Sequence, residues 1–493
     1  MGNQILGYTL DEILSTMGFG TFQGLALFFA GAGWLAEAME MMLLSFIGPA
    51  VKSEWTLSPT EESLLTTAVF GGMLVGAYFW GFISDAYGRR IAMQGADLVT
   101  AAAGLLSASS SDYKSLIIYR SLLGFGVGGG HVFTSWFLEF IPASSRGAWM
   151  IGISTFWTIG TLMGASLAWI VMPGLGWRWL LALSSIPAFL VLLLSTFAPE
   201  SPRYLYMKGR TNEALGILEK IALINRTELP TGILLSDQNM DLDEENAPSD
   251  ETPLLSSTGK KISYSETFFK SVLELFSTNL LGTTLLLWLT HFGYTFAYYG
   301  VVLLITEFNS AQRECSSTTI QFKKAQDASL YIDAFINSSA ELPGLVVGAV
   351  LVDRLGRKLT MEILTLLTFI LMLPLISHQN EILTTALLFG ARMFISTAFT
   401  ILIVYAKEVY PTSIRGTGGG LATSMGRIGG MVGVVLSCSS VPAARTAAIC
   451  VFILQLSFSD IASSTSQAIS TYSDLQCAAA ATHCMVMAVQ WYW

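Results

Sequence analysis

The stretch Asp85-Ala-Tyr-Gly88-Arg89-Arg90 occurs again later in the chain as Asp353-Arg-Leu-Gly356-Arg357-Lys358. A second motif, Glu139-Phe-Ile-Pro142-Ala-Ser-Ser-Arg146-Gly147, has a counterpart in Glu408-Val-Tyr-Pro411-Thr-Ser-Ile-Arg415-Gly416. The copies are separated by 268 residues for the aspartates (353 − 85) and by 269 residues for the glutamates (408 − 139). Each copy lies between long apolar runs. Charged loops repeated at a fixed spacing predict a chain built from two homologous halves.

The composition is that of a membrane protein. Hydrophobic residues make up 52% of the 493 residues and charged residues only 12%, against roughly 25% charged in soluble domains. The five cysteines show no paired spacing, and the four histidines form no cluster with them. We therefore expect no disulfide framework, no metal site and no cofactor.

Apolar stretches of about 20 residues predict membrane-spanning helices. In the first half they fall near 25–49, 63–83, 91–110, 115–138, 148–172 and 177–198. In the second half they fall near 279–305, 329–352, 360–377, 382–405 and 417–438, with a weaker twelfth near 446–462. The predicted fold class is therefore an all-α membrane protein.

These spans divide the chain into five parts. They are an N-terminal segment 1–24, a first bundle 25–198, a polar loop 199–275, a second bundle 276–458 and an atypical tail 459–493. Within the loop we expect an amphipathic helix at 211–224 and disorder around 228–260. Asp250-Glu-Thr-Pro-Leu254-Leu255 is similar to an acidic dileucine sorting signal, which would bind a sorting adaptor.

Lysine and arginine are concentrated in the loops on one side of the predicted spans, and such loops face the cytoplasm. Arg89, Arg146, Arg203, Arg357 and Arg415 all fall on this side. Both termini and the polar loop are therefore expected in the cytoplasm. The plasma membrane and the vacuolar membrane both remain open as the destination.

The two loop motifs resemble the signature loops of the major facilitator superfamily, and Pro199-Glu-Ser-Pro202-Arg203 resembles a companion motif. Ala36-Glu37-Ala38-Met39-Glu40-Met41 resembles the synaptic-vesicle-two-related group and, more closely, the plant organic cation/carnitine transporter 7-like group. The resemblance implies two six-helix bundles around a central cavity. It also implies a monomer in the lipid bilayer that moves nicotinate, or a related small aromatic carboxylate, together with a proton.

Glu37 and Glu40 are the expected proton-coupling residues. Three residues apart on a helix, they lie on nearly one face. An ionisable group inside a membrane is costly, so it is expected to have a partner. The alternative is a structural hydrogen bond at a helix interface.

Two arginines are expected to bind the substrate. Arg120 precedes a glycine-rich run in the fourth span, where another helix, plausibly the first, can approach closely. Arg120 would then reach Glu37 or a substrate carboxylate, unless it lies near the membrane surface. Arg427 is a lone cation about half way along the eleventh span and requires an anion, either the substrate or an acid on another helix. Asp97 and Arg392 are further intramembrane charges to which the sequence assigns no partner.

Aromatic and polar side chains in the spans are the remaining candidates for the substrate site. A flat aromatic acid can stack on aromatic rings. The candidates are His131, Trp157, Tyr294 and Tyr298. Packing in the membrane is the alternative for each.

The loop motifs are expected to form gates. Their arginines can pair with acids such as Glu139 and Glu408, and in the resembling superfamily such networks hold one conformation closed. The predicted gating residues are Asp85, Arg89, Glu139, Arg146, Asp353, Arg357, Glu408 and Arg415.

Two other functions stay open. In an organic cation or carnitine transporter, Glu37 and Glu40 would hold the cation directly. A transport-inactive receptor or trafficking protein would depend on the polar loop, so deletion of that loop separates it from a transporter. An enzyme is not expected, because the sequence contains no nucleotide-binding loop, metal cluster or nucleophile–base pair, and nothing indicates a nucleic-acid partner.

Overall fold

The computed structural model describes residues 7–142, 145–229, 233–234, 272–277, 280–314, 331–376, 380–410 and 415–439. The predicted dileucine at Leu254-Leu255, the weak twelfth span and the tail 459–493 lie outside these residues. The domain limits drawn from the sequence stay predictions.

The first half is a series of long helices that follow the predicted spans closely. They are α2 (Thr21–Trp55), α3 (Pro59–Tyr87), α4 (Arg89–Ala108), α5 (Tyr113–Val127), α6 (Gly130–Leu138), α7 (Arg146–Leu175) and α8 (Trp177–Ser195). The predicted fourth span is divided into α5 and α6 at Gly128 and Gly129.

Local sequence explains where several of these helices begin. Ser58 and Glu61 form a capping box at the start of α3, with Pro59 in the first turn. Asp112 accepts the Ser115 N–H at the start of α5. Such side chains satisfy backbone N–H groups that have no partner inside the helix.

The second half contains α12 (Leu281–Glu314), a helix at 331–339 that leads into α14 (Glu341–Leu355), α15 (Arg357–Met372) with the short 3-10 helix η2 (Leu373–Ile376), α16 (Glu381–Val409) and α17 (Arg415–Ser439). Asn380 caps α16 by accepting the Leu383 N–H.

Nine helical segments among the described residues are long and apolar enough to cross a membrane, and six of them precede residue 196. Their outer faces expose large apolar side chains such as Val75, Ile170 and Leu193, as expected for a surface in contact with lipid. The α2 segment is the most enclosed, with 72% of its most apolar window buried against 33–56% in the other eight. Charges in the middle of α2 therefore face protein.

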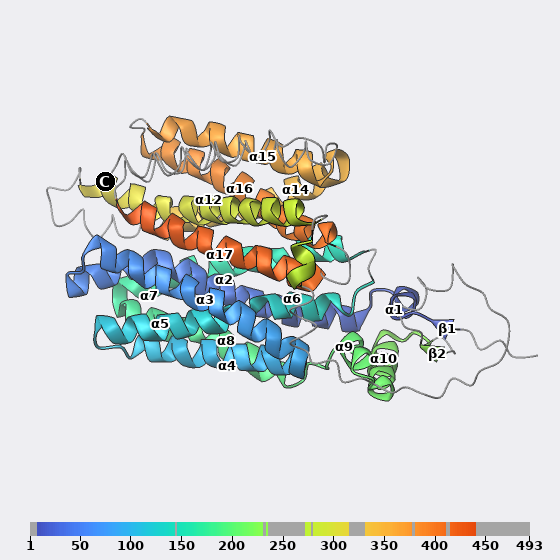
Figure 1. Cartoon of the computed structure of the whole chain (residues 1–493). Coiled ribbons are helices and arrows are strands. Elements are labelled where there is room, and N and C mark those ends of the chain that lie inside the picture. Colours follow the sequence, from blue (N-terminus) through green and yellow to red (C-terminus); the bar gives the residue numbers. More distant parts are fainter. Residues whose placement is uncertain are drawn as a thin grey trace, which may run out of the picture.

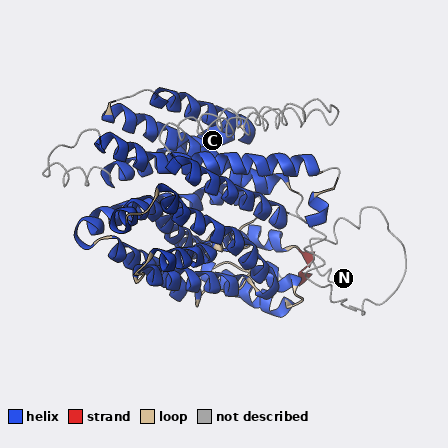
Figure 2. Ribbon diagram, turned by 60° about the vertical axis from the view of Figure 1, so that its left-hand side comes forward, coloured by secondary structure: helices blue, strands red, loops and turns tan. Residues whose placement is uncertain are grey.

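Smaller elements gather at one end of the bundle, which we call the basic end because it carries Arg89, Arg146 and Arg203. They are β1 (Gly7–Tyr8), α1 (Leu10–Met17), α9 (Pro202–Met207), α10 (Thr211–Asn225) and β2 (Ile233–Leu234) (Figure 1). The predicted amphipathic helix at 211–224 is thus confirmed as α10. The two strands form a two-residue parallel pair, shown in red in Figure 2.

The helices form two stacked groups, α2–α8 below and α12–α17 above in Figure 1. Within the upper group, helix α17 lies next to the lower group and packs on both α12 and α3. One apolar cluster includes Val69 and Phe70 of α3 together with Tyr294 and Tyr298 of α12. The two halves therefore share a core at this level.

Candidate functional site

An ion pair joins the two halves at the middle of the bundle. Glu37 of α2 lies 3.5 Å from Arg427 of α17, measured from Oε1 to Nη2. A second guanidinium nitrogen of Arg427 donates to the Tyr299 hydroxyl of α12 at 3.4 Å. The Tyr299 ring contacts Phe70 of α3 edge-on, with centroids 4.7 Å apart. On the other side of the carboxylate lies Gly130, where a Cβ would overlap the Glu37 oxygen.

Glu40 has a different environment, inside the first half alone. Its Oε2 lies 3.2 Å from Nη1 of Arg120, and its Oε1 accepts the Ser184 hydroxyl at 2.7 Å. Arg120 is fully buried, so its side chain does not extend out of the helix bundle. Arg120 pairs with Glu40 rather than with Glu37, because the side chain of Glu40, three residues further along α2, points toward α5 and α8. The two acids, although close in sequence, have separate partners.

A third buried carboxylate, Glu341, was not among the site residues predicted from the sequence. Glu341 at the start of α14 accepts Nε and Nη2 of Arg392 on Oε1, at 3.1 and 3.0 Å. The same oxygen accepts the Tyr298 hydroxyl at 3.0 Å, and Oε2 accepts the Thr158 hydroxyl of α7 at 3.3 Å. The Tyr298 oxygen also accepts the Trp157 indole N–H at 3.1 Å. We call these five residues the Glu341 cluster.

The remaining substrate candidates have other hydrogen-bond partners than Glu37 and Arg427. The Tyr294 hydroxyl contacts Thr365 of α15 at 2.7 Å, within the second half. The His131 ring makes a 3.0 Å hydrogen bond to the Gly128 carbonyl beside the start of α6. Trp157 and Tyr298 do meet, through the hydrogen bond of the Glu341 cluster. Asp97 is buried in α4, and its Oδ2 has no hydrogen-bond partner among the described residues.

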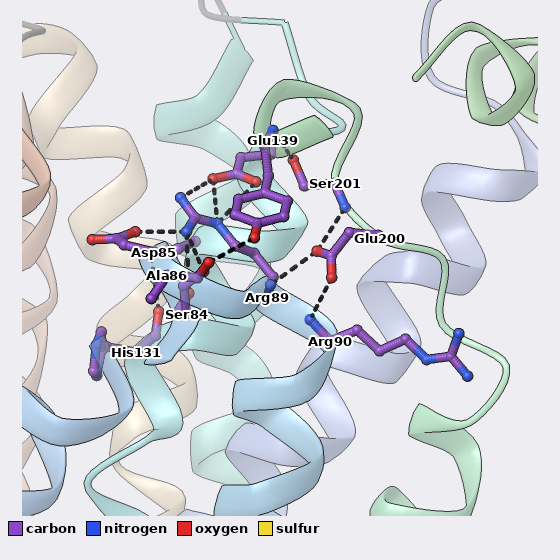
Figure 3. A network of polar contacts seen from close by, with 11 residues as sticks. Ser84, Asp85, Ala86, Arg89, Arg90, His131, Glu139, Glu200 and Ser201 are labelled. Atoms are coloured by element: carbon purple, nitrogen blue, oxygen red, sulfur yellow. Dashed lines mark hydrogen bonds and ion pairs between the residues drawn. The ribbon is translucent and has the colours of Figure 1, made fainter. Parts of the chain in front are cut away.

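The first copy of the loop motif forms a network at the basic end (Figure 3). Arg89 donates to Asp85 at 2.6 Å and to Glu139 at 3.0 and 3.1 Å. The predicted pairing of Arg89 with Glu139 is therefore confirmed. Glu200 accepts the backbone N–H groups of Arg89 and Arg90, at 2.9 and 3.3 Å. The carboxylate at the N-terminus of α4 is thus Glu200, which lies outside the repeated motif.

Arg146 pairs with an acid that lies outside the repeated motifs, which the sequence analysis did not predict. It pairs with Asp11 of α1 at 3.3 Å, and Asp11 also pairs with Arg203 of α9. The N-terminal helix therefore joins the start of α7 to α9. In the second copy, Arg357 is exposed at the start of α15. The side chains of Asp353, Glu408 and Arg415 lie outside the described residues.

The glycine-rich run also has a different neighbour than expected. Gly124 and Gly128 face α3, where a Cβ would overlap the carbonyl oxygens of Val69 and Met73. The expectation that this run faces the first span is wrong for α5, since the close approach is to α3. Contact with α2 is made further along, at Gly130.

Comparison with known proteins identifies the family. A family model described as sugar (and other) transporter matches residues 27–436. The chain belongs to this transporter family. The transporter is 52% identical over 447 residues to "Organic cation/carnitine transporter 7" of Arabidopsis thaliana, covering 87% of this chain and 89% of the relative. It is 36% identical to "Synaptic vesicle 2-related protein" of Bos taurus, covering 86% of this chain and 74% of the relative.

Solved structures show the same fold. The E. coli xylose transporter XylE, in a partially occluded inward-open conformation, aligns with a TM-score of 0.67. The alignment covers 90% of this transporter and 97% of XylE, at 17% identity. The predicted all-helical major facilitator fold and the membrane location are therefore confirmed. At this identity the likeness concerns the fold alone.

Proposed function

We propose that the transporter carries nicotinate, or a related small aromatic carboxylate, together with a proton. The observation that carries this proposal is the contact between Glu37 and Arg427, residues of opposite halves. It is long, at 3.5 Å, and neither side chain forms a second ion pair among the described residues. Such a pair is suited to exchange partners during transport.

The exchange follows from charge balance. Protonation of Glu37 removes the negative charge opposite Arg427, and a buried cation without an anion is costly. A substrate carboxylate at Arg427 restores the balance. One proton and one carboxylate then cross together without leaving an uncompensated charge in the bundle.

Two aromatic side chains lie next to each other beside Arg427, one in direct contact with it. The Tyr299 hydroxyl of α12 accepts a hydrogen bond from Arg427, and the Tyr299 ring packs edge-on against Phe70 of α3. A planar ring that follows a carboxylate into this position can pack against them edge-on or offset. This arrangement favours an aromatic acid over a short aliphatic acid.

The test is uptake of labelled nicotinate into proteoliposomes at an outside pH of about 5.5 and about 7.5, which compares uptake with and without an excess of protons outside. Glu37→Gln should lose the stimulation by acid, because its side chain no longer takes a proton. Arg427→Ala should lose uptake at both pH values. Glu54→Gln is the matched control. Glu54 is an acid at the C-terminal end of the same helix, where it lies 2.9 Å from its partner Arg178.

Acid-stimulated uptake that survives in Glu37→Gln would rule out this carboxyl as the proton carrier. Symport of one proton with one carboxylate also moves no net charge, so an imposed potassium diffusion potential should leave uptake unchanged. Uptake that follows the potential would contradict the neutral exchange.

A second candidate is the transport of organic cations or carnitine. It is favoured by the 52% identity to "Organic cation/carnitine transporter 7" of Arabidopsis thaliana. Glu37 would then bind the cation, and Arg427 would hold Glu37 in place. Uptake of labelled carnitine or tetraethylammonium in the same liposomes, with a dependence on membrane potential and no competition by nicotinate, would support this alternative.

A further inference from the structure

We propose that Glu341 is a positioning residue for the relative motion of the two halves, which it joins through hydrogen bonds to uncharged side chains of the first half. The proposal requires transport by this fold but not any particular substrate. It starts from the Glu341 cluster, in which a carboxylate of the second half contacts a side chain of the first half through Thr158.

The charge of Glu341 is balanced within its own half. Arg392 of α16 donates two hydrogen bonds to it, and both side chains are almost fully buried, at 1% and 3% exposed. Since α14 and α16 pack directly on each other, this ion pair can remain intact when the halves move. A pair that stays together imposes no cost of separating buried charges.

In the contacts that cross between the halves, the side chains contributed by the first half, Trp157 and Thr158, carry no charge. The Thr158 hydroxyl donates to Oε2 of Glu341, and the Trp157 indole donates to the Tyr298 hydroxyl, which in turn donates to Oε1. Breaking them separates no charges. They are therefore suited to form in one conformation and open in another, unlike the enclosed pair of Glu40 and Arg120.

The cluster is also adjacent to the Glu37 pair. Tyr298 and Tyr299 are consecutive on α12, and their rings meet edge-on with centroids 5.1 Å apart. Tyr299 contacts Arg427, whereas Tyr298 contacts Glu341. A shift of α12 at one contact therefore moves the other. We infer that opening of the Glu341 cluster accompanies partner exchange at Arg427.

The experiment measures the populations of the two conformations without any substrate. Spin labels at residues 53 and 332, both exposed and in opposite halves, report the separation of the halves by pulsed electron paramagnetic resonance. Thr158→Val and Tyr298→Phe remove the crossing contacts and leave Glu341 and Arg392 paired. Each should change the population ratio by about two- to tenfold, the effect of one hydrogen bond.

The chain offers two matched controls. Thr161→Val removes a buried hydroxyl of α7 whose hydrogen-bond partner among the described residues is the Thr158 carbonyl of the same helix. Tyr294→Phe removes a buried hydroxyl of α12 that bonds to Thr365 inside the second half. Both should leave the population ratio unchanged. Thermal unfolding of all four variants separates a population shift from general destabilisation.

Equal populations in Thr158→Val, Tyr298→Phe and the parent would overturn the proposal. So would shifts in the two controls as large as those in the two test variants. Because the readout contains no substrate, a failure here is distinct from a failure of nicotinate uptake.

Discussion

Glu40 and Glu37 differ at the scale of single residues in how firmly they are bound. Glu40 is held by Arg120 and Ser184 inside one half, and the guanidinium of Arg120 is fully buried. Removing one partner of such a pair leaves an uncompensated buried charge, at a cost of about 3–5 kcal/mol. Glu40 therefore stabilises the first half, whereas Glu37 makes the longer contact that the proposed partner exchange requires.

We expect Glu40→Gln to lower the thermal unfolding midpoint in detergent much more than Glu37→Gln, whose ion pair is a single 3.5 Å contact. The double variant Glu40→Gln with Arg120→Met should recover most of the loss, because it removes both charges. Equal midpoints for the two single variants would show that Glu40 is not the structural member of the pair.

At the scale of the single element, the start of helix α4 depends on Glu200. This residue lies in the loop after α8, and its carboxylate accepts the first two N–H groups of α4. Burial raises the pKa of Glu200, and the hydrogen bonds from Ser201, Arg89 and Arg90 oppose this shift. A carboxyl with a raised pKa in the folded state contributes stability that is present below its unfolded pKa. That contribution is lost as the pH rises through the folded pKa.

The replacement Glu200→Gln keeps an oxygen that can accept the same N–H groups but removes the titration. Its thermal unfolding midpoint should therefore fall less than that of the parent when the pH is raised from about 4, below the ordinary pKa of glutamate, to neutrality. Parallel pH profiles for the variant and the parent would show that Glu200 does not titrate in this range. Glu213→Gln, an exposed acid of α10, serves as the control.

At the scale of the whole molecule, further contacts between the two halves lie along the C-terminal part of α2. The Ser338 hydroxyl lies 3.9 Å from the Met42 sulfur, and the rings of Phe46 and Tyr331 have centroids 5.4 Å apart. If transport requires the halves to separate here, a covalent link across this contact should stop it.

In a background without the five natural cysteines, cross-linking of Met42→Cys with Ser338→Cys should reduce transport to background, and reduction should restore it. The control pair Met42→Cys with Gly164→Cys lies within the first half, where a Cβ on Gly164 would fall 3.2 Å from that of Met42. Linking the control pair should leave transport intact. Full activity of the Met42–Ser338 cross-linked form would contradict motion at this contact.

The sequence predicted elements and repeated motifs well, because apolar length and local charge patterns are written along the chain. The helix positions and the Arg89–Glu139 contact followed from such patterns. Partners across the bundle did not, since Glu37 and Arg427 are brought together only by the packing of α17 between the halves. Glu341 was overlooked, although an acid within a predicted span was a signal that could have found it.

Asp11 illustrates the same limit at the basic end. The N-terminal segment showed no motif, so Arg146 was expected to pair with an acid of its own motif. The structure pairs it with Asp11, 135 residues earlier. The assigned roles of the substrate and gating residues stay predictions until they are tested.

The attachment of α10 to α2 has a consequence for the order of synthesis. Asn225 accepts the Phe22 N–H at 2.9 Å and donates to Gln23 at 2.7 Å, so the last residue of α10 covers the first turn of α2. The ribosome must therefore translate all six spans of the first half before the beginning of the first one is complete. A nascent chain that stops before residue 225 leaves the Phe22 N–H and the Gln23 side chain without this partner.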